Sequence, residues 1–178
     1  MMKWQWLCPL ALATGGCVST ELLAPKGAST ELAMDIASQS TGVGLGKHWH
    51  VWKFEDPACR DPEKGVRVAR KGKGRPIETL HLPAEQPITL AFWYIEASYG
   101  VNRECSYTWT YTPKTGERYR ARLAVVRDML CSATLVDAAR TPVEVSTPEN
   151  SCAIGLYGQR VPNGEPAIIT IEVRVQAY

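Results

Sequence analysis

Short runs of apolar or alternating residues, separated by turn residues, are the feature that most constrains this sequence of 178 residues. The run at 167–175 alternates Ile169, Ile171 and Val173 with polar residues, as in a strand with one buried and one solvated face. Similar runs lie at 48–54, 65–70, 77–82, 87–97, 105–112, 118–126, 131–137, 142–145 and 152–157. The segments between them are rich in Pro, Gly, Asn and Asp. The sequence therefore predicts an all-β chain folded as an antiparallel β-sandwich.

Alternation also indicates which side chains face the expected core. The run at 118–126 sets apolar residues opposite three arginines: Tyr119, Ala121, Leu123 and Val125 against Arg118, Arg120 and Arg122. The segment at 31–37 fits a strand or a helix face, and we favour a strand because the rest of the chain is strand-like. We expect an immunoglobulin-like or transthyretin-like architecture, stabilised by disulfides.

The N-terminal residues have the organisation of a secretory signal peptide. Lys3 is the only charged residue before position 20, an apolar run follows from Trp6 to Ala13, and small residues end it. This run is far shorter than the roughly 20 residues that a helix needs to cross a bilayer. No later run approaches that length, so the sequence predicts export without a transmembrane helix.

The small residues before Cys17 resemble the lipobox of bacterial lipoproteins. A Thr-Gly-Gly segment precedes the cysteine, and Leu12 lies upstream. The resemblance implies that residues 1–16 are a signal peptide, cleaved after Gly16, and that the Cys17 sulfur carries a lipid such as palmitate. Val18, where an aspartate would mark retention at the inner membrane, implies attachment to the outer membrane, facing the periplasm. The alternative is an ordinary secretory signal with Cys17 unmodified.

Composition and patterning bound the rest of the chain. Residues 17–30 contain Pro25 and Gly27 and lack periodicity, so we expect a flexible tether there. Residues 31–178 are then expected to form a single β-sandwich domain. A formal net charge of +2 at pH 7 gives no whole-protein attraction to nucleic acid, so no nucleic-acid partner is expected. No cofactor is predicted either.

Cysteine usage indicates disulfides. Without Cys8 and Cys17, an even number remains: Cys59, Cys105, Cys131 and Cys152. In an exported domain this number is typical of two bridges, with three possible pairings. We prefer Cys59–Cys105 with Cys131–Cys152. A Cys-x-x-Cys pair is absent from the sequence, which disfavours a zinc site.

Two residue pairs are candidates for chemistry. His48 and His50 alternate on a predicted strand and could hold a transition metal, but we interpret them as partly exposed neighbours of Trp49 and assign no metal. Glu96 and Glu104 could supply the two carboxylates of a glycosidase, although acids near a loop usually form a solvated rim. No catalytic residue is assigned, and we predict that the chain is not an enzyme.

Two segments are candidates for recognition. The basic run at 64–76 could contact anionic lipid headgroups or cell-wall carboxylates, or be a solvated hairpin tip. The segment 96–105 is predicted to be a loop at one end of the sandwich, with Tyr99, Asn102 and Arg103 as binding residues. The sequence thus favours a membrane-tethered envelope lipoprotein that acts as a binding or assembly module for a protein or envelope component. The alternatives are an exported enzyme acting on envelope material and an exported inhibitor or immunity protein.

Overall fold

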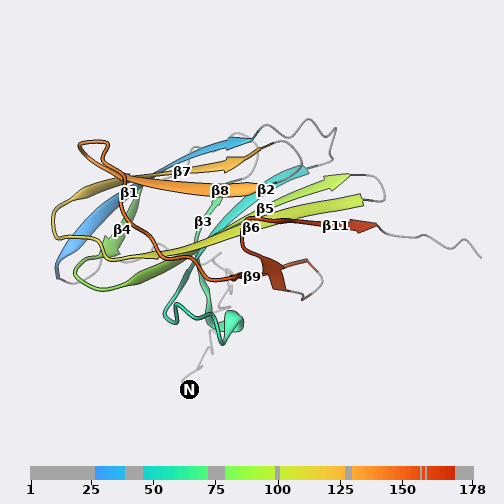
Figure 1. Cartoon of the computed structure of the whole chain (residues 1–178), viewed down its shortest axis with the longest axis horizontal. Helices are drawn as coiled ribbons and strands as arrows, with labels where there is room; N and C mark the ends of the chain where they lie inside the picture. The colour runs from blue at the N-terminus through green and yellow to red at the C-terminus, as the bar shows by residue number, and fades with distance from the viewer. Residues whose placement is uncertain are drawn as a thin grey trace, which may run out of the picture.

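Two large sheets lie face to face in the computed structural model (Figure 1). The structure describes residues 27–38, 46–71, 79–98, 101–126, 130–156, 158 and 160–170. Strands make up almost all of the regular structure in these residues, so the predicted all-β sandwich is confirmed. None of the described segments forms a helix with the length and hydropathy that a bilayer crossing requires.

The first sheet has four strands in the order β4–β1–β7–β8. These are β4 (Leu80–Pro83), β1 (Ser29–Ser38), β7 (Arg118–Val125) and β8 (Cys131–Asp137). β1 runs antiparallel to β4 but parallel to β7, and β7 and β8 are antiparallel. The parallel pair differs from the antiparallel pairing expected along the chain. No hairpin joins β1 to β7, so no tight turn fixes their relative direction.

The second sheet is antiparallel throughout and has five strands in the order β11–β6–β5–β2–β3. These are β11 (Pro166–Thr170), β6 (Val101–Tyr111), β5 (Ile88–Ser98), β2 (Gly46–Phe54) and β3 (Val66–Lys71). A small third sheet pairs β9 (Asn150–Ile154) with β10 (Arg160–Pro162), and a short 3₁₀ helix, η1 (Pro62–Lys64), precedes β3. In Figure 1, β9 and η1 lie on the side of the five-stranded sheet that faces away from β1, β7 and β8.

Most strands begin and end close to the predicted runs, and the segment at 31–37 lies within β1 as expected. The run at 142–145 is an exception, because it makes only isolated contacts. Pro142 bridges Val136, and Ser146 bridges Thr110. The predicted strand there is wrong, since Pro142 lacks a backbone N–H donor and the segment crosses from one large sheet to the other. The last part of the run at 167–175 lies outside the described residues.

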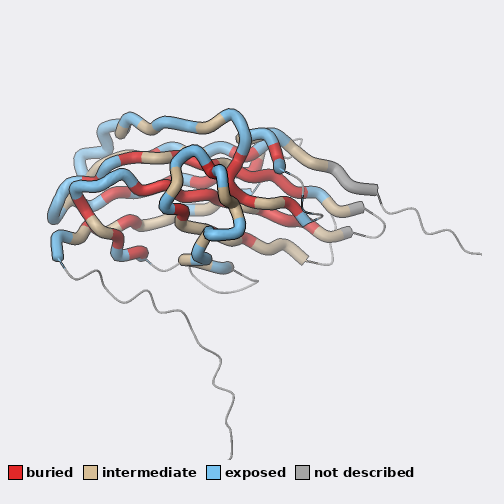
Figure 2. Tube along the Cα trace, turned by 90° about the horizontal axis from the view of Figure 1, so that it is seen from below, coloured by how far each residue is buried: buried red, intermediate tan, exposed pale blue. Residues whose placement is uncertain are grey.

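The main core fills the space between the two large sheets. Its largest fully buried side chains include Trp109, Tyr94, Phe92, Leu32 and Leu123. Figure 2 shows the buried positions concentrated along the facing strands, with exposed positions in the connections. Alternate residues of β7 contribute Ala121 and Leu123 to this core, as their alternation with arginine predicts.

A second, smaller core covers the opposite face of the five-stranded sheet. Phe54, Ala91, Cys59, Cys152 and Ala153 are buried there, and Trp52 and Trp93 pack against them. β9 and the segment that carries Cys59 form the cover. The five-stranded sheet is therefore buried on both faces near its middle. This agrees with β5, whose predicted run is apolar on both faces.

The disulfides are Cys59–Cys152 and Cys105–Cys131, so the preferred pairing from the sequence is wrong. Cys105 of β6 and Cys131 of β8 both point into the main core and link the two large sheets. Cys59 and Cys152 belong to the second core and hold its cover in place. The expectation that the domain carries two disulfides is confirmed. The pairing depends on which side of the five-stranded sheet each segment covers, which local alternation does not specify.

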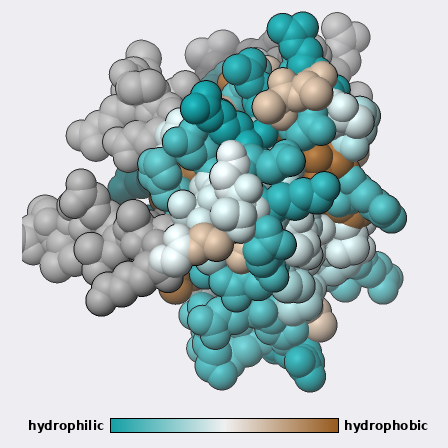
Figure 3. All heavy atoms as spheres, turned by 90° about the vertical axis from the view of Figure 1, so that its left-hand side faces the viewer, coloured by the Kyte–Doolittle hydropathy of each residue, from teal (hydrophilic) through white to brown (hydrophobic). Residues whose placement is uncertain are grey.

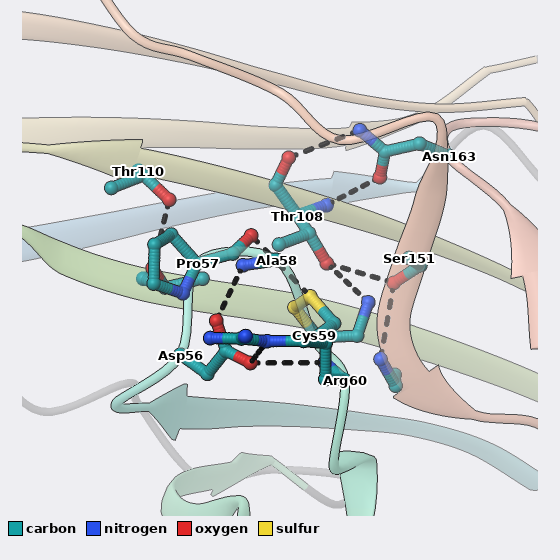
Figure 4. Close-up of a disulfide and its surroundings, with 12 residues drawn as sticks. Asp56, Pro57, Ala58, Cys59, Arg60, Thr108, Thr110, Ser151 and Asn163 are labelled. Atoms are coloured by element: carbon teal, nitrogen blue, oxygen red, sulfur yellow. Dashed lines mark hydrogen bonds and ion pairs between the residues drawn. A yellow bond between two sulfur atoms is a disulfide. The ribbon is translucent and has the colours of Figure 1, made fainter.

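Polar contacts stabilise the cover of the second core around the Cys59–Cys152 disulfide (Figure 4). Asp56 accepts hydrogen bonds from the backbone of Ala58 and Arg60 and from the Arg60 side chain, at 2.8 to 3.2 Å. The Arg60 side chain, followed by these backbone donors, lowers the pKa of Asp56 to about 2. Cys59 has φ 52, a left-handed conformation that this network and the disulfide hold in place.

Asn163 covers the part of β6 that β11 leaves unpaired. Its Oδ1 accepts from Thr108 N at 2.6 Å, and its Nδ2 donates to Thr108 O at 3.0 Å (Figure 4). Ser151 of β9 hydrogen-bonds both Ser106 and Thr108. An amide side chain thus satisfies backbone groups that an open sheet edge would expose, which protects the edge from pairing with another chain.

Candidate functional site

The candidate site is a groove on the outer face of the four-stranded sheet. Arg118, Arg120 and Arg122 of β7 are all exposed there, while Tyr119 and Ala121 between them are buried. Side chains of alternate strand residues point to the same face, so the three arginines leave the strand on one face at intervals of about 6.7 Å. We call Arg118, Arg120 and Arg122 the arginine ladder, and the hollow that they line the arginine groove.

Small side chains on both sides of Arg120 create the hollow. Ala33 of β1 and Val136 of β8 are its direct neighbours across the sheet. Thr134 of β8 lies beside Arg122 in the same way. The groove has a volume of about 680 Å³ and is also lined by Thr79 and Arg140. Small, neutral side chains therefore form the floor of the groove, and the positive charges come from the arginines of β7.

Acidic residues of β1 form one wall of the groove. Glu31 lies opposite Arg118, and Asp35 lies opposite Arg122. Glu31 Oε2 is 3.5 Å from Arg118 Nε, and both side chains are exposed. Within the described part of the chain, Arg120 and Arg122 have no ion pair shorter than 4.0 Å. The ladder therefore presents guanidinium donors that can bind carboxylate or phosphate oxygens in pairs.

Arg140 lies at one end of the groove, in the turn after β8. Asp137 holds this turn, because its backbone oxygen accepts from Arg140 N at 3.0 Å and its Oδ1 accepts from Thr141 N at 2.8 Å. Arg140 has φ 66, a conformation in which glycine is the usual residue. A fourth cation therefore occupies a left-handed position beside the ladder. Figure 3 shows the end of the molecule that lies at the left of Figure 1, where the described surface is mainly hydrophilic.

A second, smaller hollow lies on the opposite side of the sandwich, over the second core. Trp52, Phe54, Trp93, Glu63 and Gly65 are among the residues that line its volume of about 210 Å³. The Arg67 guanidinium lies over the Trp52 ring, 5.8 Å from its centroid. This contact occupies the aromatic surface from within the chain, so the hollow is a weaker candidate than the arginine groove.

The histidine pair lies on this same side of β2. His50 contacts the Trp93 ring, with centroids 5.5 Å apart. Burial, followed by the nearby charges of Arg67 and Arg70 and then His48, lowers the pKa of His50 to about 4. Among the residues that the structure describes, no three His, Cys, Asp or Glu side chains gather where they could hold a metal ion.

Glu96 and Glu104 lie on opposite faces of the five-stranded sheet. Glu96 accepts from Tyr94 OH at 3.1 Å on the side of the main core. Glu104 accepts from Trp93 Nε1 at 2.9 Å on the side of the second core. Both carboxyl groups are buried. Two carboxyl groups separated by a sheet cannot flank one glycosidic bond, so this pair does not form the glycosidase arrangement considered from the sequence.

The predicted recognition segment at 96–105 is not a loop. β5 continues to Ser98 and β6 begins at Val101, and Tyr99 lies outside the described residues. Asn102 is half-buried and Arg103 is exposed. As consecutive strand residues they point to opposite faces, so they do not form one surface. β5 and β6 pair with each other up to Ser98 and Val101, and the polar residues Asn102 and Arg103 lie within this pairing. A binding role for Tyr99, Asn102 or Arg103 stays a prediction.

Other predicted features lie wholly or partly outside the described residues. These are the signal peptide at 1–16, Cys17, most of the tether, and residues 72–76 of the basic run. Lys64, Arg67 and Arg70 of that run are described and exposed. The arginine ladder was visible in the sequence as three alternate arginines. Its acidic wall was not, because only the pairing of β1 with β7 brings the two segments together.

Comparison of the chain with protein-family models, with curated proteins and with solved structures gives no match.

Proposed function

We propose that this protein is an exported, membrane-tethered binding module that recognises an anionic partner through the arginine groove. The observation that carries this proposal is the ladder itself. Arg120 and Arg122 are exposed beside a neutral floor and have no ion pair among the described residues. Arginines at alternate positions of one strand suit bidentate contacts with carboxylates or phosphates.

Two further observations support export. The disulfides Cys59–Cys152 and Cys105–Cys131 are of the kind that forms in oxidising compartments. The small residues before Cys17 resemble the lipobox of bacterial lipoproteins. A lipid on Cys17 would hold the sandwich close to a membrane surface, and more than one acyl chain would make this attachment stable.

Tethering is tested in a bacterial host that processes lipoproteins. The full chain and a Cys17→Ser variant are expressed with labelled palmitate and fractionated into soluble and membrane material. We expect label and membrane retention in the first chain alone. Label in both chains, or in neither, would rule out Cys17 as the attachment point.

Anion binding is tested by NMR on the ¹⁵N-labelled full chain. The Nε–Hε signals of the arginines are followed while poly-glutamate or inorganic polyphosphate is added at low ionic strength. We expect the signals of Arg118, Arg120 and Arg122 to move first, and that of Arg70 on the other sheet to stay in place. Added salt should reverse the shifts, because exposed charges are screened over about 8 Å at physiological ionic strength. Equal shifts at all exposed arginines would contradict a specific groove.

A further inference from the structure

The arrangement of charge in the groove narrows the class of partner. β1 carries Glu31 and Asp35, and β7 carries the arginine ladder directly beside them. The groove therefore consists of an acidic column and a basic column that run parallel to each other, about 4.8 Å apart. A surface that only collected negative charge would not place carboxylates against its own cations.

From this arrangement we propose that the occupant is an extended polypeptide segment with acidic side chains at alternate positions. The proposal rests on the proposed function, since it assumes that the arginine groove is the binding surface. Alternate side chains of an extended strand repeat at the same interval as those of β7. Carboxylates on one face of such a segment can meet Arg118, Arg120 and Arg122 together.

The acidic column favours a polypeptide over a phosphate polymer as the occupant of the groove. A phosphate polymer carries negative charge on every unit, so Glu31 and Asp35 repel it beside Arg118 and Arg122. A polypeptide with acidic residues only at alternate positions can align its carboxylates with the arginines of β7 and carries fewer charges beside Glu31 and Asp35. The interruption of the acidic column at Ala33 leaves the centre open, where Arg120 stands without an acidic residue directly opposite.

The floor also suits a polypeptide. Ala33 lies on one side of Arg120, and Val136 and Thr134 lie on the side of the ladder away from β1, so methyl and hydroxyl groups flank the arginines. These groups can contact the Cβ atoms and methyl groups of a strand laid along β7. Arg140 closes one end and can receive a fourth carboxylate, which sets the direction of the segment.

Two hexapeptides of identical composition test the proposal. The first is acetyl-Glu-Thr-Glu-Thr-Glu-Thr-amide, and the second is acetyl-Glu-Glu-Glu-Thr-Thr-Thr-amide. Only the first places three carboxylates on one face of an extended chain. Each is titrated into the ¹⁵N-labelled full chain at low ionic strength, with the arginine Nε–Hε signals as readout. A third titration uses inorganic polyphosphate.

We expect the alternating peptide to bind about fivefold more tightly than the blocked peptide, the difference that one exposed ion pair can make. Arg120→Gln should weaken the alternating peptide by a similar factor, and Arg70→Gln should leave it unchanged. Arg70 is a matched control because it is an exposed strand arginine on the other large sheet. Glu31→Gln combined with Asp35→Asn should strengthen polyphosphate binding by removing the repulsive column.

The outcomes separate this inference from the proposed function. Equal affinity for the two peptides, or tighter binding of polyphosphate than of the alternating peptide to the unmodified chain, would overturn the polypeptide partner and leave an anion site at the ladder. No shift at Arg118, Arg120 or Arg122 with any of the three probes would overturn both. The circular dichroism spectrum of each variant establishes that the sandwich is intact.

Discussion

The Trp93 indole and the Glu104 carboxylate are joined by a hydrogen bond of 2.9 Å on the outer face of the β5–β6 pair. Glu104 Oε2 also accepts from Leu156 N at 3.0 Å. One buried side chain therefore connects an indole of the five-stranded sheet to the backbone that follows β9. The cover of the second core depends on this carboxylate as well as on the Cys59–Cys152 disulfide.

Replacing the Glu104 side chain should destabilise the fold. Glu104→Ala leaves two donors without an acceptor and should lower the free energy of unfolding by about 3 kcal/mol. Glu104→Gln keeps one acceptor oxygen and should lose less. Urea denaturation followed by Trp fluorescence measures both. Equal losses for the two variants would show that the hydrogen bonds are not the source of the effect.

Proteolytic mapping of the oxidised protein should give peptides linked through Cys59–Cys152 and Cys105–Cys131. Removing each bridge by paired Cys→Ala changes should destabilise the protein unequally. In the chain-entropy model, closure over 93 residues contributes about 4.6 kcal/mol. Closure over 26 residues contributes about 3.5 kcal/mol. Urea denaturation compares the two variants, and a peptide that links Cys59 to Cys105 would contradict the pairing.

Acid should weaken the fold through His50. Its pKa is about 4 when folded and about 6.5 in a free chain, so between these values the unfolded chain binds a proton that the fold excludes. The contribution of neutral His50 to the free energy of unfolding is fully present above pH 6.5 and decreases as the pH falls to 4. We expect a loss of about 1 to 2 kcal/mol, allowing for solvent screening of a partly exposed ring.

Chemical denaturation at several pH values measures this loss. His50→Asn should flatten the stability curve between pH 6.5 and 4. His81→Asn, which removes an exposed histidine from β4, is the matched control and should keep the slope of the unmodified chain. A slope that persists unchanged in His50→Asn would assign the acid sensitivity to other groups.

Gly65→Ala should disturb the hollow beside the second core. A Cβ at this position would lie 2.6 Å from Phe54 Cζ, too close for normal contact. The φ of −65° suits alanine, so the penalty comes from overpacking and should be about 1–3 kcal/mol. Phe54→Leu supplies space, so the double variant should lose less than the sum of the single losses in thermal denaturation. Additive losses would exclude a direct clash.

Local alternation predicted the strands, because it reports directly which side chains are buried. It also placed Cys105 and Cys131 on inward faces of their strands. It could not pair the cysteines or order the strands, because these depend on contacts between distant segments. The segment at 142–145 alternates like a strand, yet Pro142 bridges Val136 on one large sheet and Ser146, just after the segment, bridges Thr110 on the other.

The candidate site shows the same limit. The sequence displays Arg118, Arg120 and Arg122 at alternate positions, but this pattern alone describes any solvated strand face. The groove exists because β1 aligns Ala33 with Arg120 in a parallel register. That register joins two segments that lie far apart in the sequence. Conversely, the polar residues Asn102 and Arg103 suggested a loop, although strand pairing with β5 and β11 includes them.

The position of β1 between β4 and β7 has a consequence for biogenesis. β1 is made before the other described strands, yet it cannot pair along both edges until β7, ending at Val125, has also been made. Until then, Leu32 and the strand's backbone groups are open to other nascent chains. The earliest strand of this sandwich is therefore enclosed only after a strand that is made much later.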